Sequence, residues 1–131
     1  MQIIGHPFIP SQKFIHIQSH QDIDSVLANC IVWWDASQDP DLSLAKFCQE
    51  NKIQYAVQVS HLKELIFFAH LGAKYLITTT PKAQQFQSII KEYLLDCLLL
   101  CIIEDENEIE KLATLGIDGV IFYPHLQIHL H

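Results

Sequence analysis

Two carboxylates in this sequence stand where they could act on a small substrate. Asp35 directly follows two tryptophans, and a partly buried carboxylate at such a place is suited to work as a general base. Glu104 follows a long apolar run and precedes Asp105, so the two could hold a cation together with His61 or Asp35. Asp35 and Glu104 are therefore the candidate catalytic residues. The alternative is that Glu104 is a solvated loop carboxylate and that Asp105 caps a helix.

Other polar candidates follow short β-branched or aromatic runs. In strand–helix repeats, ligands bind at the carboxyl ends of the strands, where the following loops and helix N-termini gather. We therefore expect a site for a small molecule at that end. Its expected ligand-binding residues are His20, Gln58, Ser60, His61, Thr78, Thr80 and Tyr123, with His125 near them. The alternative for Ser60 and Thr80 is helix capping, and for the two first-turn histidines a position without an ionic role.

The cysteines and histidines are not spaced as metal ligands. The four cysteines form no C-x-x-C pair, and Cys97 and Cys101 fall on one expected strand, which keeps their sulfurs apart. We expect buried, reduced thiols, as in a cytoplasmic protein. No H-E-x-x-H or Cys/His pattern is present, so we predict neither a metal ion nor another cofactor. Three of the eight histidines crowd one end of the sequence: His125, His129 and His131.

Alternating strands and helices are expected to position these residues. Short apolar runs predict six strands, at residues 14–17, 31–34, 55–59, 75–78, 98–103 and 120–122. Between them apolar residues recur at helical spacing, as at Leu62, Leu65, Ile66 and Ala69. The segments 69–72 (AHLG) and 113–116 (ATLG) are near copies, which indicates a strand–helix repeat of about 22 residues.

Residues at the expected helix ends support the same repeat. Pro40 and Pro81 fit a first helical turn, and Gly72 and Gly116 stand where a helix should end in a left-handed residue. Each expected helix also follows a side chain that can accept hydrogen bonds from free backbone N–H groups. These side chains belong to Ser19, Asp39, Ser60, Thr80 and Asp105.

The order of elements indicates the fold class. A strand followed by a crossover helix leads to a parallel neighbour through a right-handed connection. We predict an α/β fold, with a parallel sheet of about six strand–helix repeats in a single domain over residues 1–131. The sheet could curl into an incomplete or small TIM-barrel-like arrangement, or it could be a doubly wound open sheet. The short repeat and the lack of a glycine-rich nucleotide loop favour the barrel-like form. Residues 2–4 could add a strand beside either edge.

Composition limits the classes of partner. The chain has 8 Lys+Arg against 15 Asp+Glu, a formal charge of −7, and no basic stripe. We therefore expect no nucleic-acid partner. The longest apolar runs are shorter than the roughly 20 residues that cross a bilayer, and the N-terminus shows no signal-peptide pattern. We expect no membrane association and a cytoplasmic location.

The region from about residue 54 to residue 124 resembles the 2-keto-3-deoxy-6-phosphogluconate aldolase family. The resemblance depends on three segments in order: 57–59 (VQV), 69–81 (AHLGAKYLITTTP) and 108–124 (EIEKLATLGIDGVIFYP). It implies a (β/α) barrel and a site for a keto acid or a sugar phosphate. The last segment is also similar to the final strand region of glycerophosphodiester phosphodiesterases, and the residues around His6 resemble their opening motif.

The sequence departs from both families at the reactive positions. The aldolases form a Schiff base through a lysine three residues before the Pro that corresponds to Pro124, and Ile121 stands there. Their proton-transferring carboxylate would fall near Val32 or Trp33, with Asp35 just beyond. Without an amine there is no carbinolamine. The phosphodiesterase motif lacks its Arg, since Pro7 follows His6. The chain is therefore expected to lack Schiff-base lyase activity.

Three functions remain open from the sequence. The first is a degenerate aldolase-like domain that binds a small, anionic metabolite. The second is a non-catalytic structural or interaction domain that forms homodimers, either through a sheet edge or through a helix face carrying Phe67 and Phe68. The third is a metal-assisted lyase or phosphodiesterase-like hydrolase that uses Asp35, Glu104 and His61.

Overall fold

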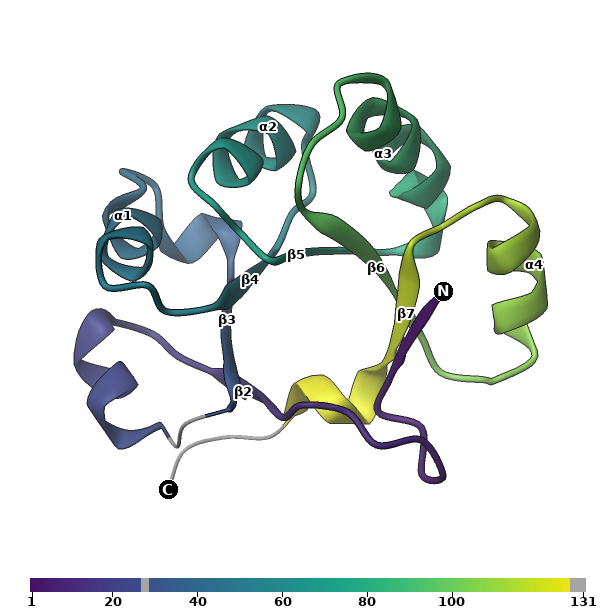
Figure 1. Cartoon of the computed structure of the whole chain (residues 1–131), viewed down its shortest axis with the longest axis horizontal. Coiled ribbons are helices and arrows are strands. Elements are labelled where there is room, and N and C mark those ends of the chain that lie inside the picture. The colour runs from purple at the N-terminus through teal and green to yellow at the C-terminus, as the bar shows by residue number, and fades with distance from the viewer. Residues whose placement is uncertain (27–28, 128–131) are drawn as a thin grey trace.

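Seven strands, all running in the same direction, form one curled sheet (Figure 1). The computed structural model describes residues 1–26 and 29–127. The strands are β1 (Gln2–Ile4), β2 (Phe14–His16), β3 (Ile31–Asp35), β4 (Tyr55–Gln58), β5 (Tyr75–Thr78), β6 (Leu98–Ile103) and β7 (Gly119–Phe122). Their order across the sheet is β1-β7-β6-β5-β4-β3-β2, so the first two strands of the chain are its two edges.

Four α-helices cover the outer side of the curl (Figure 1). They are α1 (Ser43–Glu50), α2 (Leu62–His70), α3 (Thr80–Glu92) and α4 (Glu108–Thr114). Three 3-10 helices complete the described part: η1 (His20–Ser25), η2 (Ala36–Gln38) and η3 (Tyr123–Gln127). The predicted α/β class, the parallel sheet and the incomplete barrel-like curl are confirmed. The doubly wound alternative does not apply, because it requires α-helices on both faces of the sheet. None of the described helices has the length and apolarity to cross a membrane.

One predicted helix is wrong in type. The connection between β2 and β3 contains the 3-10 helix η1 where the capping pattern at Ser19 predicts an α-helix. Within η1 only Ile23 is apolar, so this segment has no apolar stripe that could hold two α-helical turns against the sheet. The helical layer is consequently thinnest beside β2 and β3.

Side chains alternate between two buried clusters. Val32, Trp34 and Leu76 point outward and pack with the helices. Ile31, Trp33 and Ile77 point inward and belong to a second cluster inside the curl. The interior is therefore filled with apolar side chains, as in a packed (β/α) barrel.

The gap between the two sheet edges is occupied by the chain itself. Strands β1 and β2 form no ladder with each other, and η3 lies between β7 and β2 (Figure 1). Leu126 of η3 joins the inner cluster, and His125 Nε2 donates to the carbonyl of Gln12 at 2.7 Å. The η3 helix contacts β2 and β7, and pairing of a strand edge with a second subunit, the first of the two dimer contacts that the sequence suggests, stays a prediction.

All four α-helices end in the same way. At each end, a residue with positive φ follows the helix, and the next residue donates to a carbonyl five positions back, as from Ile53 to Cys48 at 2.9 Å. The left-handed residues are Lys52, Gly72, Leu94 and Gly116. The predicted ends at Gly72 and Gly116 agree with this geometry. In the other two repeats, Lys52 and Leu94 adopt this left-handed backbone conformation, which costs roughly 1–2 kcal/mol for a residue other than glycine.

This shared geometry predicts that Leu94→Gly stabilises the protein. Leu94 is 84 % exposed, so the substitution removes little packing and relieves the strain of its φ of 52°. We expect the free energy of unfolding, measured by urea denaturation, to rise by about 0.5–1 kcal/mol. Leu94→Ala is the matched control, because it removes the same side chain and keeps the Cβ atom. An equal gain from both variants would contradict the backbone explanation.

Candidate functional site

The parallel sheet brings most of the predicted site residues to one end. Asp35 and Gln58 are paired across β3 and β4, and Thr78 ends β5. Glu104 and Tyr123 directly follow β6 and β7. The carboxyl ends of the central strands thus lie together, as the sequence predicts. The placement of these residues alone does not make a binding site, which requires a cavity and free polar groups.

Backbone N–H groups at this end already have anionic partners. Glu64 Oε1 accepts from the N–H groups of Ser60 and His61 at 2.8 and 3.0 Å. Glu108 Oε2 does the same for Glu104 and Asp105, at 3.1 and 3.2 Å.

Asp22 repeats this arrangement after β2, where its Oδ2 accepts from the N–H groups of Gln18 and Ser19. Three of the loops that could cradle a phosphate or a carboxylate are therefore filled by the protein's own side chains.

Asp35 is also occupied by local contacts. Its Oδ1 accepts from the backbone N–H and the hydroxyl of Ser37, at 3.0 and 2.8 Å, and so caps η2. Gln38 Oε1 accepts from the N–H of Asp35 and lies 2.9 Å from His16 Nε2. The geometry gives Asp35 a capping role beside the half-buried His16.

The remaining predicted residues divide between buried and exposed positions. Thr78 is only 1 % exposed, and strand alternation turns it toward the helices. Thr80 is exposed at the start of α3, with Oγ1 3.6 Å from the buried Cys101 Sγ. His20 packs against Phe47, with ring centroids 5.0 Å apart, and lines a hollow of about 140 Å³. His61 and Tyr123 are exposed, and Gln58 is half-buried.

Charge at the carboxyl end is unfavourable for an anion. The loops and first helical turns there carry Asp22, Asp24, Asp35, Asp39, Asp41, Glu64, Glu104, Asp105, Glu106, Glu108 and Glu110, against Lys63 and Lys82. Lys82 Nζ donates to the Ser60 carbonyl at 2.7 Å. In the described part of the chain, these carboxylates and the histidines form no group of three that could hold a metal ion. His129 and His131 lie outside the described residues.

Ile121 occupies the position where the resemblance places a lysine. It is fully buried in the inner cluster, between β6 and β1. Lys74 lies just before β5 and thus at the opposite end of the sheet. Neither residue places an amine among the candidate residues of the carboxyl end.

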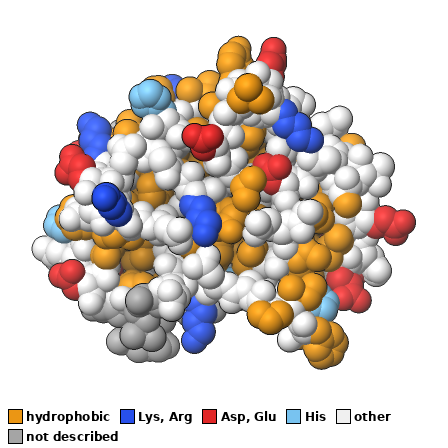
Figure 2. Space-filling model, in the orientation of Figure 1, with side chains coloured by type: hydrophobic (Ala, Val, Ile, Leu, Met, Phe, Trp, Pro, Cys, Tyr) orange, Lys and Arg blue, Asp and Glu red, His pale blue; other side chains and the backbone are white. Residues whose placement is uncertain are grey.

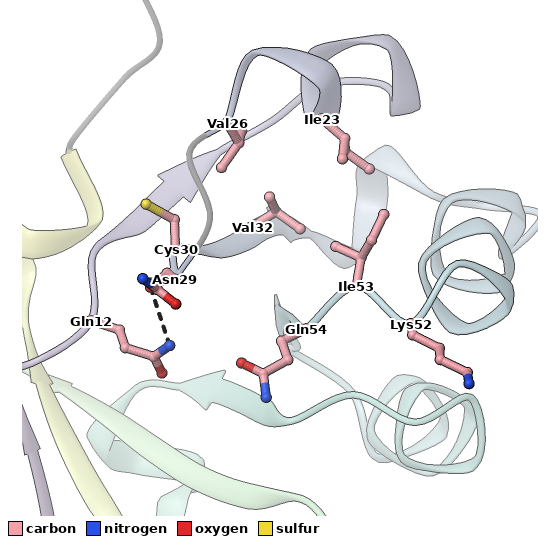
Figure 3. Close-up of a pocket in the computed structure, with 9 residues that line it drawn as sticks. All are labelled: Gln12, Ile23, Val26, Asn29, Cys30, Val32, Lys52, Ile53 and Gln54. Carbon is pink, nitrogen blue, oxygen red and sulfur yellow. Dashed lines mark hydrogen bonds between the residues drawn. The ribbon is translucent and has the colours of Figure 1, made fainter.

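The larger hollows lie at the amino-terminal ends of the strands. One of about 320 Å³ opens between η1, β3 and the loop before β4 (Figure 3). Its apolar part consists of Ile23, Val26, Val32 and Ile53. Its polar part consists of Gln12, Asn29, Lys52 and Gln54, with Cys30 at the side toward β2 (Figure 3).

Two further hollows adjoin the first. One of about 500 Å³ shares Gln12, Asn29 and Cys30 with it, and one of about 390 Å³ shares Lys52, Ile53 and Gln54. We call the three hollows together the amino-terminal groove. Its described lining includes three lysines, Lys13, Lys52 and Lys74, and no carboxylate. Figure 2, in the orientation of Figure 1, shows lysine side chains at the centre and along one side of this view, with apolar side chains exposed between them and Asp and Glu side chains among them.

Lys74 lies where the groove meets the end of the curl. Its Nζ donates to Gln12 Oε1 at 3.3 Å and to Gln54 Oε1 at 3.5 Å, and it lies 5.4 Å from the ring centroid of Tyr75. All of these partners are neutral, so the ammonium charge is not compensated by a carboxylate. A negatively charged ligand would supply the missing charge.

Sequence reasoning missed the amino-terminal groove, although part of its signal is readable. Gln12 and Gln54 stand one or two residues before a strand, and Lys13 and Lys74 stand directly before one. In a parallel sheet, the residues that precede the strands all lie at the amino-terminal end, just as the residues that follow the strands all lie at the carboxyl end. The groove itself was not readable, because its lining comes from segments that only the folded sheet brings together.

The cysteines do not form a reactive site in the described structure. All four are free thiols, and Cys48, Cys97 and Cys101 are buried. Burial, together with the charge of Asp39, raises the pKa of Cys48 to about 12, and burial raises the pKa of Cys97 to about 11. These two thiols therefore stay protonated near neutral pH and are poor nucleophiles.

Comparison with known proteins adds no family. No protein-family model matches the chain, and no curated protein matches it.

Proposed function

We propose that this chain is a non-catalytic binding domain that takes an anionic ligand in the amino-terminal groove. The observation that carries the proposal is the groove's lining: three lysines and several amides without a carboxylate, in a chain whose formal charge is −7. Lys74, held by neutral partners only, is the central contact. The ligand stays anionic, as the sequence suggests, but its site moves to the amino-terminal ends of the strands.

Three requirements argue against the carboxyl-end alternatives. Binding a keto acid or a sugar phosphate there would require N–H groups that Asp22, Glu64 and Glu108 already occupy. An aldolase-like reaction would require an amine near Ile121. Metal-assisted hydrolysis through Asp35, Glu104 and His61 would require those three groups to converge on one ion.

The test is a titration of the ¹⁵N-labelled protein with succinate, phosphate, pyruvate and glucose 6-phosphate, followed by NMR. We expect the largest amide shifts at residues 12–13, 52–54 and 74, and almost none with 1,4-diaminobutane. Lys74→Gln should raise Kd about tenfold, since a charged hydrogen bond contributes roughly 1.5–3 kcal/mol. Lys111→Gln, on the exposed face of α4, is the control and should leave Kd unchanged.

The same titration separates the alternatives. Shifts confined to Gln58, Ser60 and Tyr123 would move the site back to the carboxyl end and overturn the proposal. No saturable shift with any anion would also overturn it.

A second candidate function is self-association through the outer face of α2. Ile66 and Phe67 are each 45 % exposed there, whereas Phe68, which the sequence pairs with Phe67, is 1 % exposed and belongs to the core. A homodimer through Ile66 and Phe67 would bury both side chains. Sedimentation of the protein and of Phe67→Glu tests it, because a monomer at high concentration in both cases would remove this candidate.

The proposal also covers location and partners. A cytoplasmic location is supported by four cysteines that are all free. A nucleic-acid partner is not proposed, because the surplus of carboxylates repels the phosphate backbone over most of the surface.

A further inference from the structure

We infer that the occupant of the amino-terminal groove is an extended acidic peptide segment of a partner protein, with one aliphatic side chain among its carboxylates. This inference rests on the proposed function and names the ligand class of the same groove.

The length of the groove suits a short extended chain. Its hollows follow the amino-terminal ends of β2, β3, β4 and β5, as Lys13, Cys30, Gln54 and Lys74 show by their places beside these strands. Neighbouring strands are about 4.8 Å apart, so the groove crosses three spacings, or roughly 14 Å. An extended peptide rises about 3.3 Å per residue and covers this distance with four or five residues.

The lysines come from three segments at this end of the sheet. Lys13 lines the hollow beside β2, Lys52 lines two adjoining hollows, and Lys74 lies before β5 with its Nζ reaching Gln12 Oε1, next to Lys13. Within residues 1–26 and 29–127, none of the three forms an ion pair. Separate ammonium groups match carboxylates on more than one side chain better than they match one compact anion.

Lys52 is held in a backbone conformation that glycine would adopt more easily. Its φ is 56°, and Gly72 and Gly116 fill the same position in two other repeats. Leu94 adopts the same conformation without a proposed role, so the positive φ does not by itself assign a function to the Lys52 side chain, but it makes Lys52→Gly a substitution that the fold accepts without strain.

The amide side chains suit a peptide backbone. Gln49 and Gln54 line the hollow beside Lys74, and an amide both donates and accepts hydrogen bonds, as a peptide group does. The Oε1 atoms of Gln12 and Gln54 already accept from Lys74 Nζ, so these amides offer a ligand mainly their N–H groups, from which a peptide carbonyl can accept.

The apolar hollow accounts for the aliphatic side chain. Val32 and Ile53 form its floor and η1 supplies Ile23, with a volume of about 320 Å³ that admits a leucine or an isoleucine (Figure 3). No exposed aromatic ring lines the groove, because Tyr55 is buried and donates to the Leu71 carbonyl at 2.8 Å. Single-stranded nucleic acids depend on such rings for stacking, so the groove favours a peptide over them.

The test uses the full chain and a fluorescein-labelled peptide, Glu-Asp-Leu-Asp-Glu, with both ends blocked. We expect saturable binding that weakens as NaCl is raised, because exposed charges are screened. A peptide with lysines in place of the four acids should not bind. Replacing its leucine by alanine should weaken binding about fivefold, from lost burial of the side chain. A labelled poly-dT oligonucleotide is the competing macromolecule.

Lys52→Gly is the decisive variant. This variant should raise the melting temperature, because it relieves the positive φ. It should also raise the Kd for the peptide about threefold to fivefold, because it removes a charge. Loss of binding in a more stable protein cannot be explained by unfolding. Lys13→Gln should raise the Kd for the peptide by a similar factor, and Lys111→Gln should leave this Kd unchanged.

The outcomes separate this inference from the function on which it rests. If succinate or phosphate shifts the groove amides while the peptide binds no better than free succinate, the peptide inference fails and the anion-binding proposal stands. If neither binds, both fail. If poly-dT displaces the peptide with equal or higher affinity, or if Lys52→Gly binds as well as the unchanged protein, the peptide inference is wrong.

Discussion

Asp39→Ala is expected to lower the free energy of unfolding by about 2–3 kcal/mol. Asp39 is 2 % exposed, and its two carboxylate oxygens accept from the backbone N–H groups of Leu44 and Ala45, at 2.9 and 3.0 Å. Removing the side chain leaves both donors buried without a partner at the start of α1. Urea denaturation followed by circular dichroism measures the loss.

Asp41→Ala is the matched control for this prediction. Asp41 accepts from the N–H of Ser43 at 3.1 Å, so it serves the same helix, but it is exposed. Hydrogen bonding to Ser43 lowers the pKa of the Asp41 carboxyl. Water replaces its contact when the side chain is removed, and we expect little change in stability. If the two variants were equally destabilised, burial would not be the source of the Asp39 effect.

Gly119→Val is expected to lower the free energy of unfolding by about 2–3 kcal/mol. A Cβ atom at Gly119 would lie 2.7 Å from Leu100 Cδ2 and 2.8 Å from the backbone oxygen of Gln2. Gly119 is paired with Gln2 on one side and Leu100 on the other, so the added side chain pushes against both neighbouring strands. Thermal and urea denaturation both measure the effect.

A double variant identifies the cause. Leu100→Ala makes room on one side of Gly119, but the backbone of β1 remains on the other. The cost of Gly119→Val should therefore be smaller in the Leu100→Ala background, and part of it should persist. A cost that is the same in both backgrounds would show that Leu100 does not restrict this position.

The strands were the most predictable part of the fold. The runs at 75–78 and 98–103 coincide with β5 and β6, because buried parallel strands need continuous apolar segments. Helix ends were predictable only where glycine marks them. Lys52 and Leu94 adopt the same left-handed conformation without the residue type that signals it.

The sequence predicts that Asp39 caps α1, but it does not predict where that helix begins. Asp39 does cap α1, yet the helix begins at Ser43. The reason is the turn that Pro40 and Leu42 form first, with the N–H of Leu42 donating to the Asp39 carbonyl at 3.1 Å.

The sequence predicts which end of the sheet carries the candidate site residues. It does not predict that local hydrogen bonds already occupy the groups that a ligand would need. Sequence order is enough to place Asp35, Gln58 and Glu104 at the same end of the sheet, although β5 separates the strands that carry Gln58 and Glu104. It does not reveal that Glu64 and Glu108 turn back onto the loop N–H groups, although the spacing from Asp105 to Glu108 hints at one such pair. The amino-terminal groove depends on lysines from distant segments, which only the folded sheet brings together.

The strand order also sets the sequence of events during synthesis. Strand β1 precedes all the other described strands in the chain, but the described ladder that it forms is with β7, whose residues lie more than a hundred positions later. Until the ribosome has released β7, residues 2–4 have no partner, whereas β2 and β3 can pair early. We therefore expect β1 to join the sheet last. In nascent chains stopped before β7, β1 would stay unpaired.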